Sequence, residues 1–385
     1  MGDCLAALLS PVGPEAFFLN YRKREYLFVA RNREDFYDSM VGVGDLDEYL
    51  QSELLPASSI NIVRDGVRCP LDAWSTTTTL PRGSDRYAAP EKIFSLYGSG
   101  DTVILNAVDH TVPPVTRVCR ELARELGHPV QANIYITPPH GQGFANHRDE
   151  HDVLVLQIHG RKCWRIFPDA QDGAGTAPAV DLEMRQGDLL YIPRGTAHEA
   201  KCSDVASIHV TVGLLPIYAF HLIEELAASA RDHPLFQDPV PLAVEGSPAR
   251  QEFEAEFTRR LEAMLTGTPV ATLVGRRMRH IVDNQPRGWP GRLVDVLGVR
   301  EITGDSVLCA RPTIIRSIED SGNSLDVHFA GNKITVPGFL RGCVDRMLGN
   351  TPFTVGDLEG LLTTEGKVEL VRPFVTYGLL SIVRV

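Results

Sequence analysis

Two histidines and an aspartate are the residues whose types and spacing best suit metal chemistry. His147 and Asp149 lie two positions apart, so on an extended strand or strand end their side chains project to the same side. A third ligand must come from elsewhere, and His198 follows a predicted strand and a turn that contains Pro193 and Gly195. Two imidazoles and one carboxylate make a facial triad, which leaves positions open on Fe(II) for a bidentate co-substrate and oxygen. We therefore predict an iron site at these three residues.

Neighbouring residues leave other ligand assignments open. His151 and Asp152 are alternatives to Asp149 if the register of the strand slips, and His209, in the run SIHVTV, is an alternative to His198. His151 falls on the same face as Asp149, one strand step deeper, and His209 lies on a later strand. We keep His151 and His209 as candidates that flank the metal without binding it.

A lysine in the next predicted strand offers a positive charge to the same site. Lys162 follows the turn at Gly160 and enters the run RKCWRIF, in which strand alternation puts Lys162 and Trp164 on one face. A lysine that faces the interior with Trp164 needs an anionic partner, because burying an unpaired charge is costly. We predict that Lys162 binds the distal carboxylate of 2-oxoglutarate. A lysine at a solvated turn is the alternative interpretation.

The elements around these residues are predicted to be mainly strands. From Ala132 to about Leu215, turn residues separate the segments NIYITPP, VLVLQIHG, KCWRIFP, DLLYIPRG and SIHVTVGLLP. Several short strands at this spacing indicate a small barrel or jelly roll. An amphipathic helix precedes them, with an apolar stripe made by Val115, Val118, Leu122 and Leu126.

The second half of the chain is predicted to begin with helices. Residues 217–231 read as one helix, and a second begins with Ser247 as N-cap and carries an apolar stripe: Phe253, Phe257, Leu261, Met264 and Leu265. This stripe fits a subunit interface and packing within the chain equally well.

The last segment, about 270–385, combines predicted strands and helices. KITV and SIVRV read as strands, and GFLRGCVDRMLG and TVGDLEGLLT as helices, with Thr354 as a possible cap of the latter. This order resembles a winged helix. Its helices have no dense Lys/Arg face, which disfavours DNA binding.

Bulk properties limit the class of protein. A length of 385 residues favours two or three domains, and 43% hydrophobic with 23% charged residues is typical of a soluble globular protein. The net charge of −11 makes nucleic acid an improbable partner but suits a cationic peptide. Seven scattered cysteines without CxxC pairs argue against disulfides and structural zinc. Since neither a membrane span nor a signal peptide is recognisable, we expect a cytoplasmic protein.

One long motif carries a family resemblance. The string NxYxTPPxxQGFxxHxDxHDVxVLQxxGxKxW, followed by GDLLYxPRGxxHxA, resembles the JmjC/cupin family that contains the ribosomal oxygenases, which hydroxylate protein side chains. The resemblance is close over about 132–213 and extends to the flanks only in layout. It implies iron at His147, Asp149 and His198, the 2-oxoglutarate carboxylate at Lys162, and a co-substrate pocket lined by Asn133 and Tyr135.

The resemblance also implies an architecture. The expected fold is α+β, with a double-stranded β-helix (jelly-roll, cupin) core. Residues 1–216 would form the oxygenase domain with an N-terminal extension, its core at about 90–216. Residues 217–268 would form a helical dimerisation region, and 269–385 a winged-helix-like domain.

The implied function is a dioxygenase that uses Fe(II), 2-oxoglutarate and O2 to hydroxylate an amino-acid side chain of a protein or peptide, in a homodimer. The segment HRDEHD departs from eukaryotic members at His151 and Asp152, which leaves the substrate open. A hydroxylase of a small amino-acid-like metabolite and a non-catalytic metal-binding cupin are the alternatives.

Overall fold

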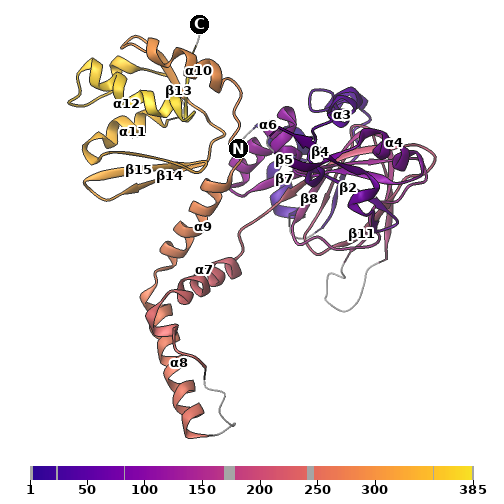
Figure 1. Cartoon of the computed structure of the whole chain (residues 1–385), viewed down its shortest axis with the longest axis horizontal. Helices are drawn as coiled ribbons and strands as arrows, with labels where there is room; N and C mark the ends of the chain where they lie inside the picture. The colour runs from indigo at the N-terminus through magenta and orange to yellow at the C-terminus, as the bar shows by residue number, and fades with distance from the viewer. Residues whose placement is uncertain are drawn as a thin grey trace. The chain divides into compact units, whose positions relative to one another are not determined.

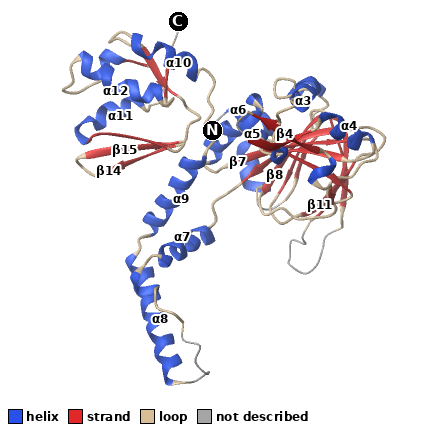
Figure 2. Cartoon of the chain, in the orientation of Figure 1, coloured by secondary structure: helices blue, strands red, loops and turns tan. Residues whose placement is uncertain are grey.

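A computed structural model describes residues 3–22, 25–81, 83–168, 178–240, 247–349 and 351–383. The chain forms two compact units, Met1–Pro216 and Ile217–Val385 (Figure 1). Both units combine helices and strands (Figure 2), which confirms the predicted α+β class. The further predicted boundary between residues 268 and 269 stays a prediction.

A large antiparallel sheet dominates the first unit. Its strands are ordered β1-β10-β8-β12-β7-β6-β2-β3, and β9 and β11 also pair with β8. The bounds are β1 Leu27–Val29, β2 Ile60–Arg64, β3 Val67–Arg68, β6 Thr102–Leu105, β7 Val130–Thr137, β8 Asp152–Phe167, β9 Val180–Arg185, β10 Leu189–Ile192, β11 Ala197–Lys201 and β12 Ser207–Leu214. A separate hairpin joins β4 (Ser75–Leu80) to β5 (Gly83–Ala88).

The long strand β8 folds this sheet into two layers. Its first part pairs with β10 and β12, and its second part pairs with β9 and β11. The change occurs near Gly160, whose φ is +66°, and a Cβ atom there would lie 1.8 Å from the carbonyl oxygen of Ala206. Only glycine fits this close approach. One strand that serves two sheet layers agrees with the predicted double-stranded β-helix.

The apolar run at the start of β8 is buried on both of its faces. Val153 and Val155 belong to one hydrophobic cluster with Trp164, while Leu154 and Leu156 belong to the larger cluster of the unit. Residues on alternate sides of the strand therefore bury against different layers, which explains a nearly continuous apolar sequence.

Helices supply much of the larger cluster. The predicted amphipathic helix is α6 (Pro113–Leu126), which buries Val115 and Leu122 and ends at Gly127 with φ +67°. The other helices of this unit are α1 (Asp3–Leu9), α2 (Pro14–Ala16), α3 (Val43–Leu50), α4 (Pro90–Gly98) and α5 (Val108–Thr111).

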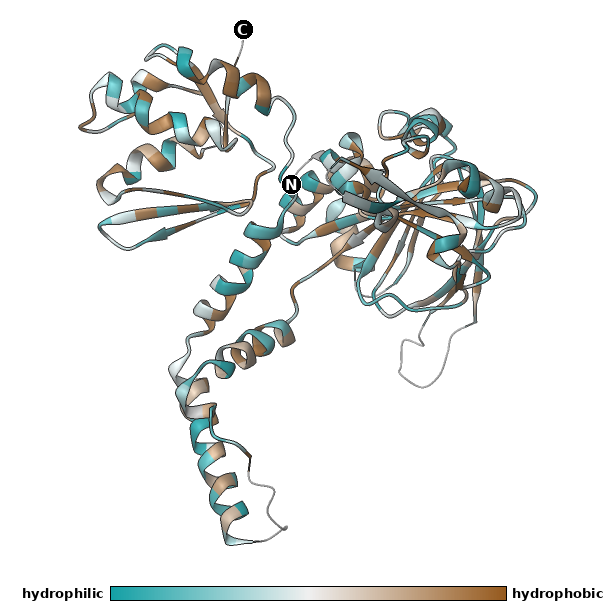
Figure 3. Ribbon diagram, in the orientation of Figure 1, coloured by the Kyte–Doolittle hydropathy of each residue, from teal (hydrophilic) through white to brown (hydrophobic). Residues whose placement is uncertain are grey.

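The second unit begins with three helices that bury little: α7 (Ala219–Arg231), α8 (Pro248–Gly267) and α9 (Val270–Asn284). Their small core consists of Leu226, Met264 and Leu273. Hydrophobic positions are spread along α8 (Figure 3), but Met264 is its one buried residue. Ser247 occupies the predicted N-cap position, although its side chain makes no capping hydrogen bond.

The rest of the second unit contains two three-stranded sheets, β17-β13-β18 and β14-β15-β16. The strands are β13 Val307–Ala310, β14 Arg316–Asp320, β15 Ser324–Phe329, β16 Asn332–Pro337, β17 Phe353–Thr354 and β18 Leu380–Ile382. The helices are α10 (Arg292–Gly298), α11 (Arg341–Met347) and α12 (Thr364–Thr376). No helix among the described residues is both long and apolar enough to cross a membrane.

One predicted helix in this unit is wrong. The segment TVGDLEGLLT, expected to be helical from Thr354, instead completes a short strand and a 3-10 turn. Its side chains Val355 and Leu358 insert into the core, and Gly360 has φ +127°, which a helix does not allow. The helix starts later, where the Thr363 hydroxyl accepts a hydrogen bond from the Gly366 amide. The winged-helix interpretation stays a prediction.

Candidate metal centre

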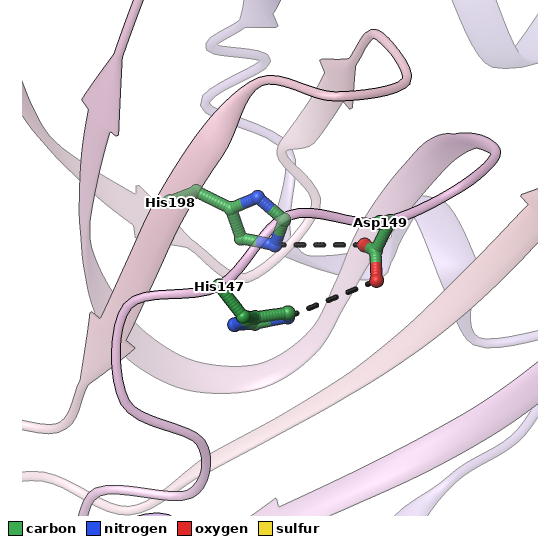
Figure 4. A group of neighbouring side chains, drawn as sticks. All are labelled: His147, Asp149 and His198. Carbon is green, nitrogen blue, oxygen red and sulfur yellow. Dashed lines mark ion pairs between the residues drawn. The ribbon is translucent and has the colours of Figure 1, made fainter.

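Backbone pairing brings the three predicted metal ligands together. His147, before β8, and His198, in β11, exchange two backbone hydrogen bonds of 3.1 and 3.0 Å. Their Nε2 atoms lie 3.8 and 3.6 Å from the two carboxylate oxygens of Asp149 (Figure 4). The potential ligand atoms of the three residues all lie within 4.8 Å of one another. A single cation of the size of Fe(II) fits donors grouped in this way.

The opposite ring nitrogens fix how the imidazoles are oriented. Nδ1 of His147 lies 2.9 Å from the Ala145 carbonyl oxygen, and Nδ1 of His198 lies 3.0 Å from that of Thr196. Because a carbonyl oxygen only accepts, both Nδ1 atoms carry the hydrogen and both Nε2 lone pairs are available for a metal. Burial, together with the nearby His147, lowers the pKa of His198, which favours the neutral form that binds metal.

The three residues open onto a cavity of about 310 Å³. Its lining includes Lys162, Trp164, Phe144, Asn133, Tyr135 and His151. Among the described residues that line the cavity, Asp149 is the one carboxylate and Lys162 is the one lysine or arginine. The cavity therefore offers a negative metal-binding end and a single buried cation.

Lys162 faces this interior, as strand alternation predicted, and its hydrogen-bond partner within the described chain is a threonine hydroxyl. The side chain is 3% exposed, and Nζ donates a 2.8 Å hydrogen bond to the Thr137 hydroxyl, which also accepts one from Thr102. Burial lowers the pKa of Lys162 to about 8. Among the described residues no acidic group pairs with it, and the distal carboxylate of 2-oxoglutarate as its anionic partner stays a prediction. The sequence reasoning missed Thr137, although Asn133, Tyr135 and Thr137 alternate along one strand face.

The two predicted co-substrate residues also line the cavity. The side-chain oxygen of Asn133 accepts a 3.0 Å hydrogen bond from the Ala107 amide. The ring of Tyr135 stacks on His209 at a centroid distance of 4.8 Å, and burial raises the pKa of Tyr135 to about 12. Both groups are neutral at physiological pH. Their contact with 2-oxoglutarate stays a prediction.

The alternative ligand candidates lie outside the donor group. His209 is buried between Tyr135 and Trp164, and this burial holds its pKa well below the usual value. The carboxylate of Asp152 is fully buried and accepts a hydrogen bond from the Arg194 amide instead. His151 lines the cavity, with Nδ1 3.2 Å from the Asp152 carbonyl oxygen.

A second donor cluster, which the sequence reasoning did not find, lies in the second unit. Potential ligand atoms of Glu319, Asp326 and His328 also lie within 4.8 Å of one another. Arg279 of α9 forms an ion pair with Glu319 and contacts the His328 ring, and Lys333 lies 3.2 Å from Asp326. Two cations therefore already neutralise this cluster.

Comparisons with known proteins agree with the geometry of the first site. Residues 109–222 match the family model of the JmjC domain. Ribosomal oxygenase 1 of Rattus norvegicus is 32% identical over 224 residues, which cover 53% of this chain and 36% of the relative. The bifunctional lysine-specific demethylase and histidyl-hydroxylase NO66 of Dictyostelium discoideum is 33% identical over 224 residues, covering 54% and 42%. The chain thus matches less than half the length of these relatives.

A solved structure resembles the chain over most of its length. YcfD, a ribosomal oxygenase from Escherichia coli in complex with cobalt and succinic acid, superposes with a TM-score of 0.58 at 19% identity, covering 96% of this chain and 97% of that one. Residues 109–222 are thus similar to a JmjC domain, and the fold of the chain is similar to that of YcfD. In sequence, the chain is similar to the ribosomal oxygenases. A JmjC domain with a His-Asp-His donor group supports the predicted cofactors, Fe(II), 2-oxoglutarate and O2.

Proposed function

We propose that this chain is an Fe(II)- and 2-oxoglutarate-dependent oxygenase that hydroxylates an amino-acid side chain of a protein or peptide. The observation that carries the proposal is the donor group of His147, Asp149 and His198, with Nε2 lone pairs available, in the lining of a cavity that also contains a buried lysine. Iron held there would supply the oxidative chemistry, in which 2-oxoglutarate loses CO2 and one oxygen atom enters the substrate.

The remaining residues of the cavity have separate tasks in this proposal. Lys162, which the Thr137 hydroxyl orients through a hydrogen bond, would hold the distal carboxylate of 2-oxoglutarate, because a buried ammonium group without an acidic partner gains most from binding an anion. Tyr135, Phe144 and Trp164 would exclude water around the substrate carbon. Asn133 would orient the co-substrate from β7.

The substrate class is proposed from the relatives. Their names describe ribosomal oxygenases and a histidyl-hydroxylase that is also a lysine demethylase. The net charge of −11 suits a basic protein segment. We favour hydroxylation, with the oxygen retained in the product, over demethylation.

Measuring product formation tests this proposal. The protein would be incubated with Fe(II), 2-oxoglutarate, O2 and digests of ribosomal proteins, with succinate and peptide masses followed together. We expect succinate formation coupled to a peptide heavier by one oxygen atom. Succinate without any modified peptide would contradict the protein substrate, and the loss of a methyl group would favour demethylation.

The helical region supports a homodimer as part of this proposal. On α8, Phe257, Leu261 and Leu265 are 43, 39 and 53% exposed, and Met264 alone is buried. A long helix in water depends on burying its apolar side. A second copy of the chain would cover these side chains.

Replacing Phe253 and Phe257 by Asp should therefore yield monomers in sedimentation experiments, because the charges would stay unpaired in an apolar interface. Glu252→Lys, an equally large charge change on the same helix, serves as control and should leave the dimer intact. Wild-type protein that sediments as a monomer would contradict the dimer.

A further inference from the structure

A backbone hydrogen bond joins the segment that carries Asp149 to the turn before His198, in addition to the two between His147 and His198. Strand β10 pairs with β8 as far as Ile192 and Val153, and the chain then turns away toward β11. In this turn the Gly195 amide donates a 2.9 Å hydrogen bond to the carbonyl oxygen of Asp149. The path of this turn determines where His198 enters the metal centre.

The Asp152 carboxylate acts at the point where the strand pairing ends. It is fully buried, and Oδ1 accepts a 3.0 Å hydrogen bond from the Arg194 amide. This hydrogen bond extends the pairing of β10 with β8 beyond Ile192, and the acceptor is a side-chain oxygen instead of a backbone carbonyl oxygen. Asp152 thus links the strand that follows Asp149 to the turn that precedes His198.

The second oxygen of Asp152 faces the N-terminal segment. Oδ2 lies 3.9 Å from Nε of Arg22, and neither atom has a hydrogen-bond partner among the described residues. The arginine side chain is 13% exposed. A buried carboxylate needs a compensating positive charge, and the Arg22 guanidinium is placed beside this oxygen.

The N-terminal segment is itself fixed to the barrel. Phe17, which is fully buried, packs edge-on against Tyr191 of β10 at a centroid distance of 4.8 Å. The Arg22 amide donates to the Phe17 carbonyl oxygen, which closes the turn that carries the arginine. Arg22 therefore approaches Asp152 from an anchored element.

We infer that Asp152 is a positioning residue of the metal centre, which holds the turn before His198 in place with the support of Arg22 from the N-terminal extension. This inference rests on the proposed metal site and deepens it. Groups that orient metal ligands without touching the metal typically change metal affinity by about 10–100-fold when they are removed.

The test compares metal affinity and thermal stability in three variants of the full chain. Asp152→Ala removes the acceptor, and Asp152→Asn keeps one oxygen for the Arg194 amide. Asp188→Ala is the matched control, because Asp188 is also buried in the first unit and accepts backbone hydrogen bonds, from Arg31 and Arg185, away from the metal centre.

Anaerobic titration of metal-free protein with Co(II) gives the readout. We expect Asp152→Ala to bind Co(II) at least about tenfold more weakly, Asp152→Asn to recover most of the affinity, and Asp188→Ala to lose thermal stability without losing metal affinity. Wild-type affinity in Asp152→Ala would overturn the inference, and so would an equal loss in Asp188→Ala. Wild-type protein that does not bind Co(II) would instead contradict the proposed function.

A second measurement covers the case in which Asp152→Ala does not fold. The Arg194 amide of the unmodified, metal-free protein should exchange its hydrogen slowly, because Asp152 protects it before any metal binds. Exchange as fast as that of an unstructured peptide would overturn the inference.

Discussion

Two clusters of metal-binding residue types in this chain differ in what surrounds them. His147, Asp149 and His198 in the first unit, and Glu319, Asp326 and His328 in the second, each bring their potential ligand atoms within 4.8 Å. The first cluster opens onto a cavity in which Lys162, the one lysine or arginine among the described lining residues, donates a hydrogen bond to Thr137.

The second cluster is already satisfied by positive charges. Arg279 pairs with Glu319 and contacts His328, while Lys333 and the Thr335 hydroxyl bond to the Asp326 carboxylate. A metal ion would have to displace these partners. Proximity of donors is thus common to a metal centre and a network of ion pairs, and the position of the neighbouring cations separates the two.

Removing one carboxylate from each cluster should give the largest difference between the clusters in Fe(II) binding and turnover. Asp149→Ala takes away the one anionic donor of the first cluster, so we expect loss of stoichiometric Fe(II) binding and of 2-oxoglutarate turnover. Asp326→Ala should leave both unchanged. Anaerobic calorimetry with Fe(II) measures the binding. Turnover by Asp149→Ala, or a matching loss in Asp326→Ala, would invalidate the distinction.

Lys162, beside the first cluster, and Lys333, in the second, should differ in their effect on 2-oxoglutarate binding. Lys162→Ala removes the proposed partner of the 2-oxoglutarate carboxylate, and charged hydrogen bonds of this kind contribute about 1.5–3 kcal/mol. We expect 2-oxoglutarate to bind roughly 10–100-fold more weakly, with Fe(II) binding retained. Lys333→Ala is the control. Unchanged 2-oxoglutarate affinity in Lys162→Ala would mean that another group holds the distal carboxylate.

The depressed pKa of Lys162 predicts a pH dependence of co-substrate binding. The ammonium form predominates below pH 8 and is lost as pH rises through the pKa of about 8. Affinity for 2-oxoglutarate should be constant below that value and fall about tenfold per pH unit above it. Lys162→Arg stays protonated, so its affinity should remain flat to higher pH. A wild-type profile without the break would contradict this assignment.

The smallest effect is expected from the second cluster. Glu319→Gln weakens a pair whose carboxylate is 56% exposed, so it should lower the free energy of unfolding by less than about 1 kcal/mol. Chemical denaturation of the full chain checks this value. Weaker Fe(II) binding in this variant would show that the ion-pair interpretation of the cluster is wrong.

The sequence predicted those parts of the site that depend on local periodicity. A two-residue spacing placed His147 and Asp149 on one side, and alternation turned Lys162 inward. The sequence did not predict the observed contacts of Thr137 and Asp152, because Thr137 bonds to residues on other strands and Asp152 bonds to the turn after β10. The sequence does not reveal which distant segments pair. The same reason hid the cluster of Glu319 and His328, which depends on the pairing of β14 with β15.

The secondary structure was likewise predictable where it depends on local sequence patterns. The strands between Ala132 and Leu215 and the helix α6 were predicted from local patterns. The helix expected from Thr354 was wrong because tertiary burial of Val355 and Leu358 prevailed over local helix signals. Local sequence patterns therefore predicted most of the strands and helices. The contacts of their side chains depend on segments that are distant in the sequence.

His147, Asp149 and His198 are proposed to bind iron, which 2-oxoglutarate then chelates. Metal-free protein would be titrated without oxygen, first with Fe(II) and then with 2-oxoglutarate, while the visible charge-transfer band of the chelate is recorded. We predict a band that appears at one equivalent of iron in the wild type and is absent in His198→Ala. No band in the wild type, or a full band in His198→Ala, would contradict the claim.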